Sequence, residues 1–161
     1  MTYAEYERWL REAAEAASPS ARRAFALDTM RLLEVPALDL IKSQLTESEQ
    51  DLVSTAMREV TMAVPEHTAS ALKALQESMF REEARSQDFH PYVNNLLDAL
   101  FAWCKYRRTE ETRWIAQIAI LMGNHLDHAS EIDIHDVLGS PAMAEEFERQ
   151  RRMLDGASPT R

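Results

Sequence analysis

The chain has 161 residues, of which 45% are hydrophobic and 28% charged, a size and composition typical of one globular domain with a core of its own. Its formal net charge of −9 disfavours nucleic acid as a partner, because phosphates are held by basic faces, and it favours a partner with a basic surface. No stretch reaches the ~18 uncharged apolar residues of a membrane span, and the start MTYAEYERWL carries acids and no apolar run, so we expect no membrane contact, no secretory signal and a cytoplasmic location.

Residues that start helices recur along almost the whole chain, which contains only three glycines. Thr2 with Glu5, and Thr46 with Glu49, have the spacing of capping boxes, in which a hydroxyl and a carboxylate bind backbone N–H groups that lack a partner within the helix. Four prolines suited to a first helical turn and one threonine predict further helix entries, at Ser18–Pro19, Val64–Pro65, His90–Pro91, Ser140–Pro141 and Thr109. The pattern predicts an all-α fold, a bundle of about seven helices.

Apolar residues at spacings of three and four predict the helices of the first half of the chain. In chain order these are a helix over 3–17, a second from Pro19 to Pro36, a short one through Leu45, one opening at Thr46 and one following Pro65. Pro36 is expected to interrupt the second helix, because proline lacks a donor and clashes with the preceding turn. The short helix after Pro36 should then run in a different direction from the helix before it.

The same spacing continues in the second half. In chain order it predicts a helix from Pro91 to the basic cluster at 105–108, a very apolar helix over about 110–129, and a helix from Pro141 to just before Gly156. Residues 131–137 alternate polar and apolar side chains, but a lone strand would have no partner, so we expect an ordered loop. Residues 1–156 should form one domain, followed by a disordered tail at 157–161.

The sequence predicts no catalytic residue and no cofactor. It contains no Gly-x-Ser-x-Gly elbow, no Gly-rich phosphate loop and no dinucleotide fingerprint. Cys104, the only cysteine, falls on the apolar side of its helix and is interpreted as a small core residue rather than a nucleophile. We therefore expect that the protein is not an enzyme.

One alternative is a metal-binding bundle enzyme or sensor that uses His125, His128 and His135. The first two are three residues apart on a helix, so both rings reach one side of it, a geometry that metal sites in bundles use. Neither the Glu-x-x-His of di-iron bundles nor the His-Glu-x-x-His of zinc proteases occurs in the chain. A polar helix end and a hydrated loop are therefore favoured over a metal site.

Three stretches resemble the all-helical bacterial family catalogued as domain of unknown function 416. They are ARRAFAL at 21–27, LLDALFAW at 96–103 and SPAMAEEFERQ at 140–150, the last entered through proline as in that family. The resemblance implies a helical bundle and no established activity, and it carries over no functional residue. In its compact, acidic and motif-poor character the chain is also similar to small immunity proteins of bacterial toxin systems.

These observations favour a non-catalytic protein-binding protein, most concretely an immunity protein that neutralises a cognate toxin by masking a basic surface. The predicted contact is the acidic segment formed by Asp127, Glu131, Asp133 and Asp136. A further alternative is a self-associating adaptor, a homodimer for instance, with exposed Trp9 or Trp114 as its contact.

Overall fold

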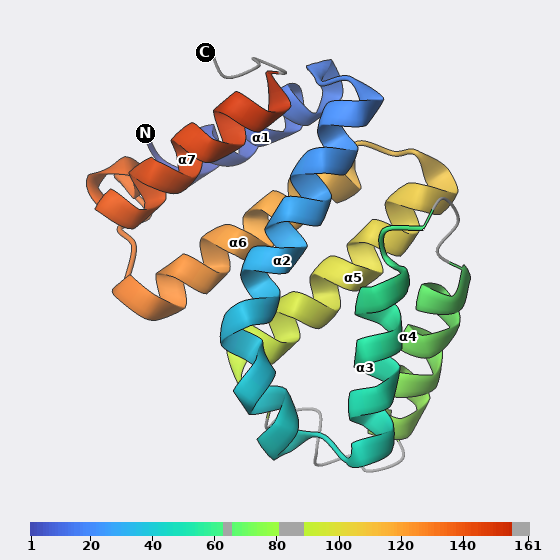
Figure 1. Ribbon diagram of the computed structural model, residues 1–161. Coiled ribbons are helices and arrows are strands. Elements are labelled where there is room, and N and C mark those ends of the chain that lie inside the picture. Colours follow the sequence, from blue (N-terminus) through green and yellow to red (C-terminus); the bar gives the residue numbers. More distant parts are fainter. Residues whose placement is uncertain (63–65, 81–88, 156–161) are drawn as a thin grey trace, which may run out of the picture.

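The computed structural model describes residues 1–62, 66–80 and 89–155, and within these ranges it contains helices and no strand. The chain forms the predicted all-α bundle (Figure 1). Its elements are α1 (Tyr3–Ala16), α2 (Pro19–Gln44), α3 (Glu47–Glu59), α4 (Glu66–Phe80), α5 (Pro91–Thr109), α6 (Arg113–Ser130), the short 3-10 helix η1 (Val137–Gly139) and α7 (Pro141–Leu154). None of the described helices is long and apolar enough to cross a membrane. The helix entry predicted at 64–65 and the tail predicted at 157–161 lie outside the described residues.

Both capping boxes predicted from sequence are present. The Thr2 hydroxyl accepts from Glu5 N at 3.3 Å, and Glu5 Oε2 accepts from Thr2 N at 2.8 Å. Thr46 and Glu49 repeat the arrangement at the start of α3. These side chains bind N–H groups that the first helical turn leaves unpaired, so the bounds of α1 and α3 follow directly from local sequence.

The helix over 19–44 is continuous, so the predicted break at Pro36 is wrong. Pro36 lies inside α2 and removes one hydrogen bond, at a cost of about 3 kcal/mol. Leu33, Ala37 and Ile41 are buried along one face on both sides of the proline. Burying such side chains stabilises by about 1.5–3 kcal/mol for each large one, which offsets the lost bond and holds both halves of α2 on the same core.

The entry predicted at Thr109 is also wrong, because Thr109 is the last residue of α5 and α6 begins at Arg113. The Thr109 hydroxyl donates back to Lys105 O at 2.9 Å. Glu110 then takes a left-handed conformation, with φ 57°, and its N–H caps α5 by donating to Tyr106 O at 2.7 Å. A basic helix end and a turn therefore occupy the positions where the sequence suggested a new helix.

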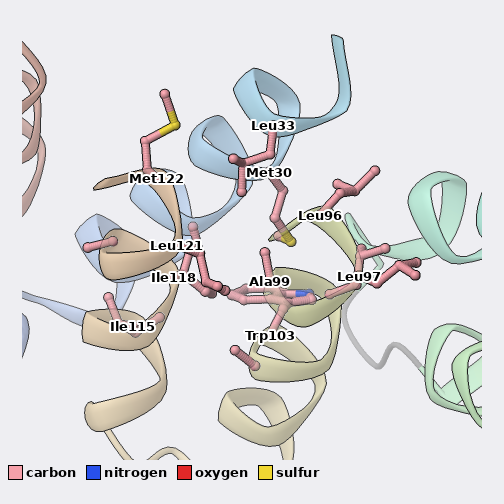
Figure 2. Packing of buried hydrophobic residues seen from close by; sticks show 14 of the residues in the cluster. Met30, Leu33, Leu96, Leu97, Ala99, Trp103, Ile115, Ile118, Leu121 and Met122 are labelled. Carbon is pink, nitrogen blue, oxygen red and sulfur yellow. The ribbon is translucent and has the colours of Figure 1, made fainter. Parts of the chain in front are cut away.

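The core lies where α2 crosses α5 and α6, with α3 and α4 on one side and α1 and α7 on the other (Figure 1). Helix α3 packs against α4, and α5 packs against α6. Figure 2 shows side chains of α2, α5 and α6 meeting in this core, among them Met30, Leu96, Trp103 and Ile118. Trp103 is fully buried, and its Nε1 donates to Val60 O at 3.0 Å, which ties the end of α3 to α5.

Candidate functional site

The four predicted contact acids lie on one surface segment, residues 127–136, which we name the acidic loop. It begins in the last turn of α6, where Glu131 takes a left-handed conformation with φ 47° and donates its N–H to Asp127 O at 2.8 Å. The carboxylate of Asp127 accepts from Ile132 N at 2.7 Å, and that of Asp133 accepts from His135 N at 2.8 Å. Two of the predicted contact residues therefore also hold the loop in shape.

The N-terminus lies beside the acidic loop, as the hydrogen bonds between them show. Tyr3 N donates to Ile134 O at 2.8 Å, and Val137 N donates to Met1 O at 3.0 Å. The N-terminal ammonium stands 3.4 Å from Asp136 Oδ1. Residues 131–137 thus form an ordered loop, as predicted. The backbone of this alternating segment is hydrogen-bonded to residues at the N-terminus.

An apolar side chain stands in the middle of the acidic loop. Ile134 is 61% exposed, while all four acids of the segment are also exposed. Val137 is buried and, with Tyr3, Gly123 and part of Ile134, lines a small cavity of about 60 Å³. The segment therefore presents one exposed apolar side chain together with four exposed carboxylates, and its backbone is held by hydrogen bonds on both sides of Ile134.

A buried polar network fixes the helices next to this loop. Arg149 of α7 donates to Glu146 through two nitrogens, at 2.7 and 2.8 Å, and to Asp28 of α2 at 2.6 Å. Gln150 donates to Glu146 at 2.8 Å and accepts from the Tyr6 hydroxyl of α1 at 2.9 Å. Burial raises the pKa of that Tyr6 hydroxyl well above its usual range, so it stays a donor. Helices α1, α2 and α7 are therefore joined by one chain of hydrogen bonds.

Three histidines and a tyrosine gather where α5 begins and α6 ends. The Tyr92 ring centre lies 4.6 Å from that of His90, 4.3 Å from that of His125 and 5.4 Å from that of His128. The rings of His90 and His128 are 5.1 Å apart. His125 and His128 thus share a side of α6, as predicted, but their neighbour is His90, which no spacing in the sequence connects to them. We name these four residues the histidine cluster.

The metal alternative gains no support from these positions. His135 sits in the acidic loop, where its backbone N–H binds Asp133. Within the described ranges, no three His, Cys, Asp or Glu side chains are arranged to hold a metal ion. The histidine cluster is instead an aromatic contact between α5 and α6.

The histidine cluster predicts a pH effect on stability. Burial lowers the pKa of His125, and the positive charges of His128 and His90 lower it further. The Tyr92 ring of α5 contacts the His125 ring, and the charges that act on His125 are those of His128 on α6 and of His90, the N-cap of α5, whose N–H donates to Gln44 of α2 at 3.0 Å. The pKa of His125 is lower in the folded state than the unfolded value of about 6.5, so the unfolded chain takes up the proton first as the pH falls. The free energy of unfolding therefore decreases as the pH falls from about 6.5 towards the folded-state pKa.

We therefore expect His125→Gln to flatten the fall in the urea midpoint between pH 7.5 and pH 5. His135→Gln is the matched control, because His135 is an exposed histidine outside the cluster. Urea unfolding followed by circular dichroism at several pH values measures the effect. Equal pH profiles for His125→Gln and the unchanged chain would contradict it.

The two tryptophans suggested as self-association contacts are only partly exposed. Trp9 packs against Phe147, with ring centres 4.5 Å apart. The Arg113 guanidinium lies 4.8 Å from the ring centre of Trp114. Each tryptophan therefore has a ring contact within its own chain.

Comparison of the chain with family models, with curated proteins and with solved structures finds no match. The resemblance to domain of unknown function 416 stays an expectation from sequence. Functional inference therefore depends on the geometry of this chain alone.

Proposed function

We propose that this protein is a non-catalytic binding protein whose acidic loop holds a partner with a basic surface. The observation that carries the proposal is Ile134, an isoleucine 61% exposed on the same short segment as the exposed acids Asp127, Glu131, Asp133 and Asp136. Interfaces gain most of their affinity from a few desolvated anchors surrounded by polar residues that exclude water. Ile134 and the four exposed acids supply both kinds of residue on one segment.

The rigidity of the loop supports the same proposal. Backbone bonds from Tyr3 and to Met1 hold the segment on both sides of Ile134. A surface that is already ordered loses less conformational entropy when a partner binds. The acids around it, on a chain with net charge −9, speed the approach of a cationic partner by electrostatic steering.

In its more specific form, the proposal is an immunity protein that neutralises a bacterial toxin. A toxin that acts on nucleic acid, for example, has a basic substrate surface, and an acidic loop with an apolar anchor is complementary to such a surface. Binding there would block the substrate without any chemistry on the inhibitor. This form predicts that a gene beside the one for this chain encodes the toxin.

The test measures association with that purified toxin. We expect Asp133→Lys combined with Asp136→Lys to slow association about tenfold at low salt and to weaken its salt dependence, because both changes invert the charge that steers the encounter. Biolayer interferometry at several salt concentrations gives the rates. Asp51→Lys with Glu77→Lys is the matched control, since both side chains are exposed on α3 and α4 and the change in net charge is the same.

Two outcomes would overturn the assignment. If the loop variant and the control slow association equally, only net charge matters and the acidic loop is not the contact. If no neighbouring gene encodes a toxin that this chain inhibits, the immunity form fails.

A further inference from the structure

The outer face of α2 carries an unusual concentration of exposed apolar side chains. Leu32 is 41% exposed, Val35 71% and Leu38 44%, and Val35 is the most exposed large hydrophobic residue among those described. The three are spaced three apart and so lie on one side of the helix. Figure 1 shows α2 crossing in front of α5 and α6, and the exposure of the three side chains indicates that they point away from that core.

The charges around these residues are arranged antisymmetrically about Val35. Arg31 and Asp39 are each four positions from Val35 and carry opposite charges. Asp28 and Lys42 are each seven positions away, again with opposite charges. Leu32 and Leu38, each three positions away, carry the same side chain. All of these positions fall on or beside the outer face, given the ~100° turn per residue that follows from 3.6 residues per turn.

We propose that α2 pairs with α2 of a second copy of this chain, antiparallel, about a two-fold axis through Val35. In such a pair each position meets the one equally far from Val35 in the other copy. Arg31 then faces Asp39, Asp28 faces Lys42, Leu32 packs on Leu38, and the two Val35 side chains meet at the axis. A parallel pair would instead set like charges against each other.

The exposure of these charged side chains within one copy favours their pairing with a second copy. The Lys42 ammonium is 4.0 Å from Asp39, and the two side chains are 71% and 99% exposed, so this pair adds little within one copy. Asp28 is held by Arg149 at 2.6 Å and remains 44% exposed, which presents its carboxylate in a fixed position. The mirrored pattern fits a second copy because only a self-complementary partner requires it. The inference is independent of the acidic loop.

Sedimentation equilibrium of the full chain from about 1 µM to 1 mM tests the proposal. We expect a reversible dimer, whose dissociation constant Val35→Glu raises by about 100-fold or more, because two carboxylates then meet at the axis. Met62→Glu, at a residue 52% exposed outside α2, should leave the constant unchanged. A monomer at every concentration, or equal association of Val35→Glu and the unchanged chain, would overturn it.

Charge exchange tests the antiparallel register. Arg31→Asp alone and Asp39→Arg alone should each weaken the dimer about tenfold, because each sets like charges against each other. The double variant should recover most of the loss, since opposite charges then face each other again across the axis, with their positions exchanged. A double variant weaker than either single one would overturn the pairing.

Cross-linking provides a second, structural readout. Val35→Cys should form an intermolecular disulfide readily, whereas Leu38→Cys should not, because two cysteines at 38 lie on opposite sides of the axis. Burial raises the pKa of the native Cys104 thiol to about 11, so it does not compete at pH 8. Preferential cross-linking at 38 would overturn the two-fold axis at Val35.

Discussion

Replacing Arg149 with methionine should lower the free energy of unfolding by about 3–5 kcal/mol, because the buried carboxylate of Glu146 keeps its hydrogen bond from Gln150 but loses the positive charge that pairs with it. The Arg149 side chain is 16% exposed and that of Glu146 5%. Two of the guanidinium nitrogens bind Glu146, and the guanidinium also reaches Asp28 and the Thr29 hydroxyl of α2, the latter at 2.8 Å. Methionine fills similar space but donates no hydrogen bond, so the effect reports the lost pairing rather than a cavity.

Urea unfolding followed by circular dichroism measures this loss. Arg151→Met is the matched control on the same helix, because Arg151 pairs with Glu148 at 2.7 Å but both side chains are 53% exposed. An exposed pair of this kind is worth about 0–1 kcal/mol. Adding Glu146→Gln to Arg149→Met should recover part of the loss by removing the unpaired charge. Equal destabilisation by Arg149→Met and Arg151→Met would contradict the role of burial.

Local signals predicted the fold well because helix entries depend on a few neighbouring residues. The capping boxes at Thr2 and Thr46 begin α1 and α3 as expected. The predictions at Pro36 and Thr109 failed because something outside the local pattern overrode a local preference: tertiary packing at Pro36 and a turn at Thr109. At Pro36 the core holds the helix together, and at Thr109 the hydroxyl donates to Lys105 O of the helix that it ends and accepts from Glu111 N in the turn that follows.

The candidate site was predicted in part. The sequence placed four acids on one segment, and the structure shows that Asp127 and Asp133 also shape the loop through backbone bonds. Their role in binding a partner stays a prediction. The exposure of Ile134 could not be predicted, because an alternating pattern does not say which apolar side chain turns inward.

Contacts between distant residues carried no local signal. The approach of His90 to His128 joins residues from the start of α5 and the end of α6. Arg149 lies among several basic residues of the last helix, and nothing near it in the sequence points to its partner Asp28, which is 121 positions away. A pairing of this kind depends on how whole helices cross, which the local pattern of one sequence does not reveal.

Helices α1 and α7 connect the buried polar network to the acidic loop. The loop is bounded by α6 and η1, and its backbone binds the segment that leads into α1. Tyr6 of α1 and Arg149 of α7 anchor the two neighbouring helices through Glu146 and Gln150. Loss of Arg149 should therefore loosen the frame that holds Ile134, and so weaken partner binding as well as stability.

Ile134→Glu should weaken binding of the basic partner by about 2–4 kcal/mol, roughly 30- to 1,000-fold in the dissociation constant, if Ile134 is the anchor of the interface. The side chain is 61% exposed, so its replacement leaves the core intact. The added carboxylate increases the negative charge of the loop, so the association rate should hold or rise. The loss of affinity should therefore appear as faster dissociation with no slower association. A change in overall charge alone would not produce this combination of rates.

Interferometry separates the two rates, and urea unfolding verifies that the variant is as stable as the unchanged chain. Met62→Glu is the control, because Met62 is 52% exposed and lies outside the acidic loop. If Ile134→Glu and Met62→Glu dissociate at the same rate, Ile134 is not the anchor. Steering by the four acids would then stand without an apolar contact at their centre, and the residues that keep the partner bound would lie elsewhere on the surface.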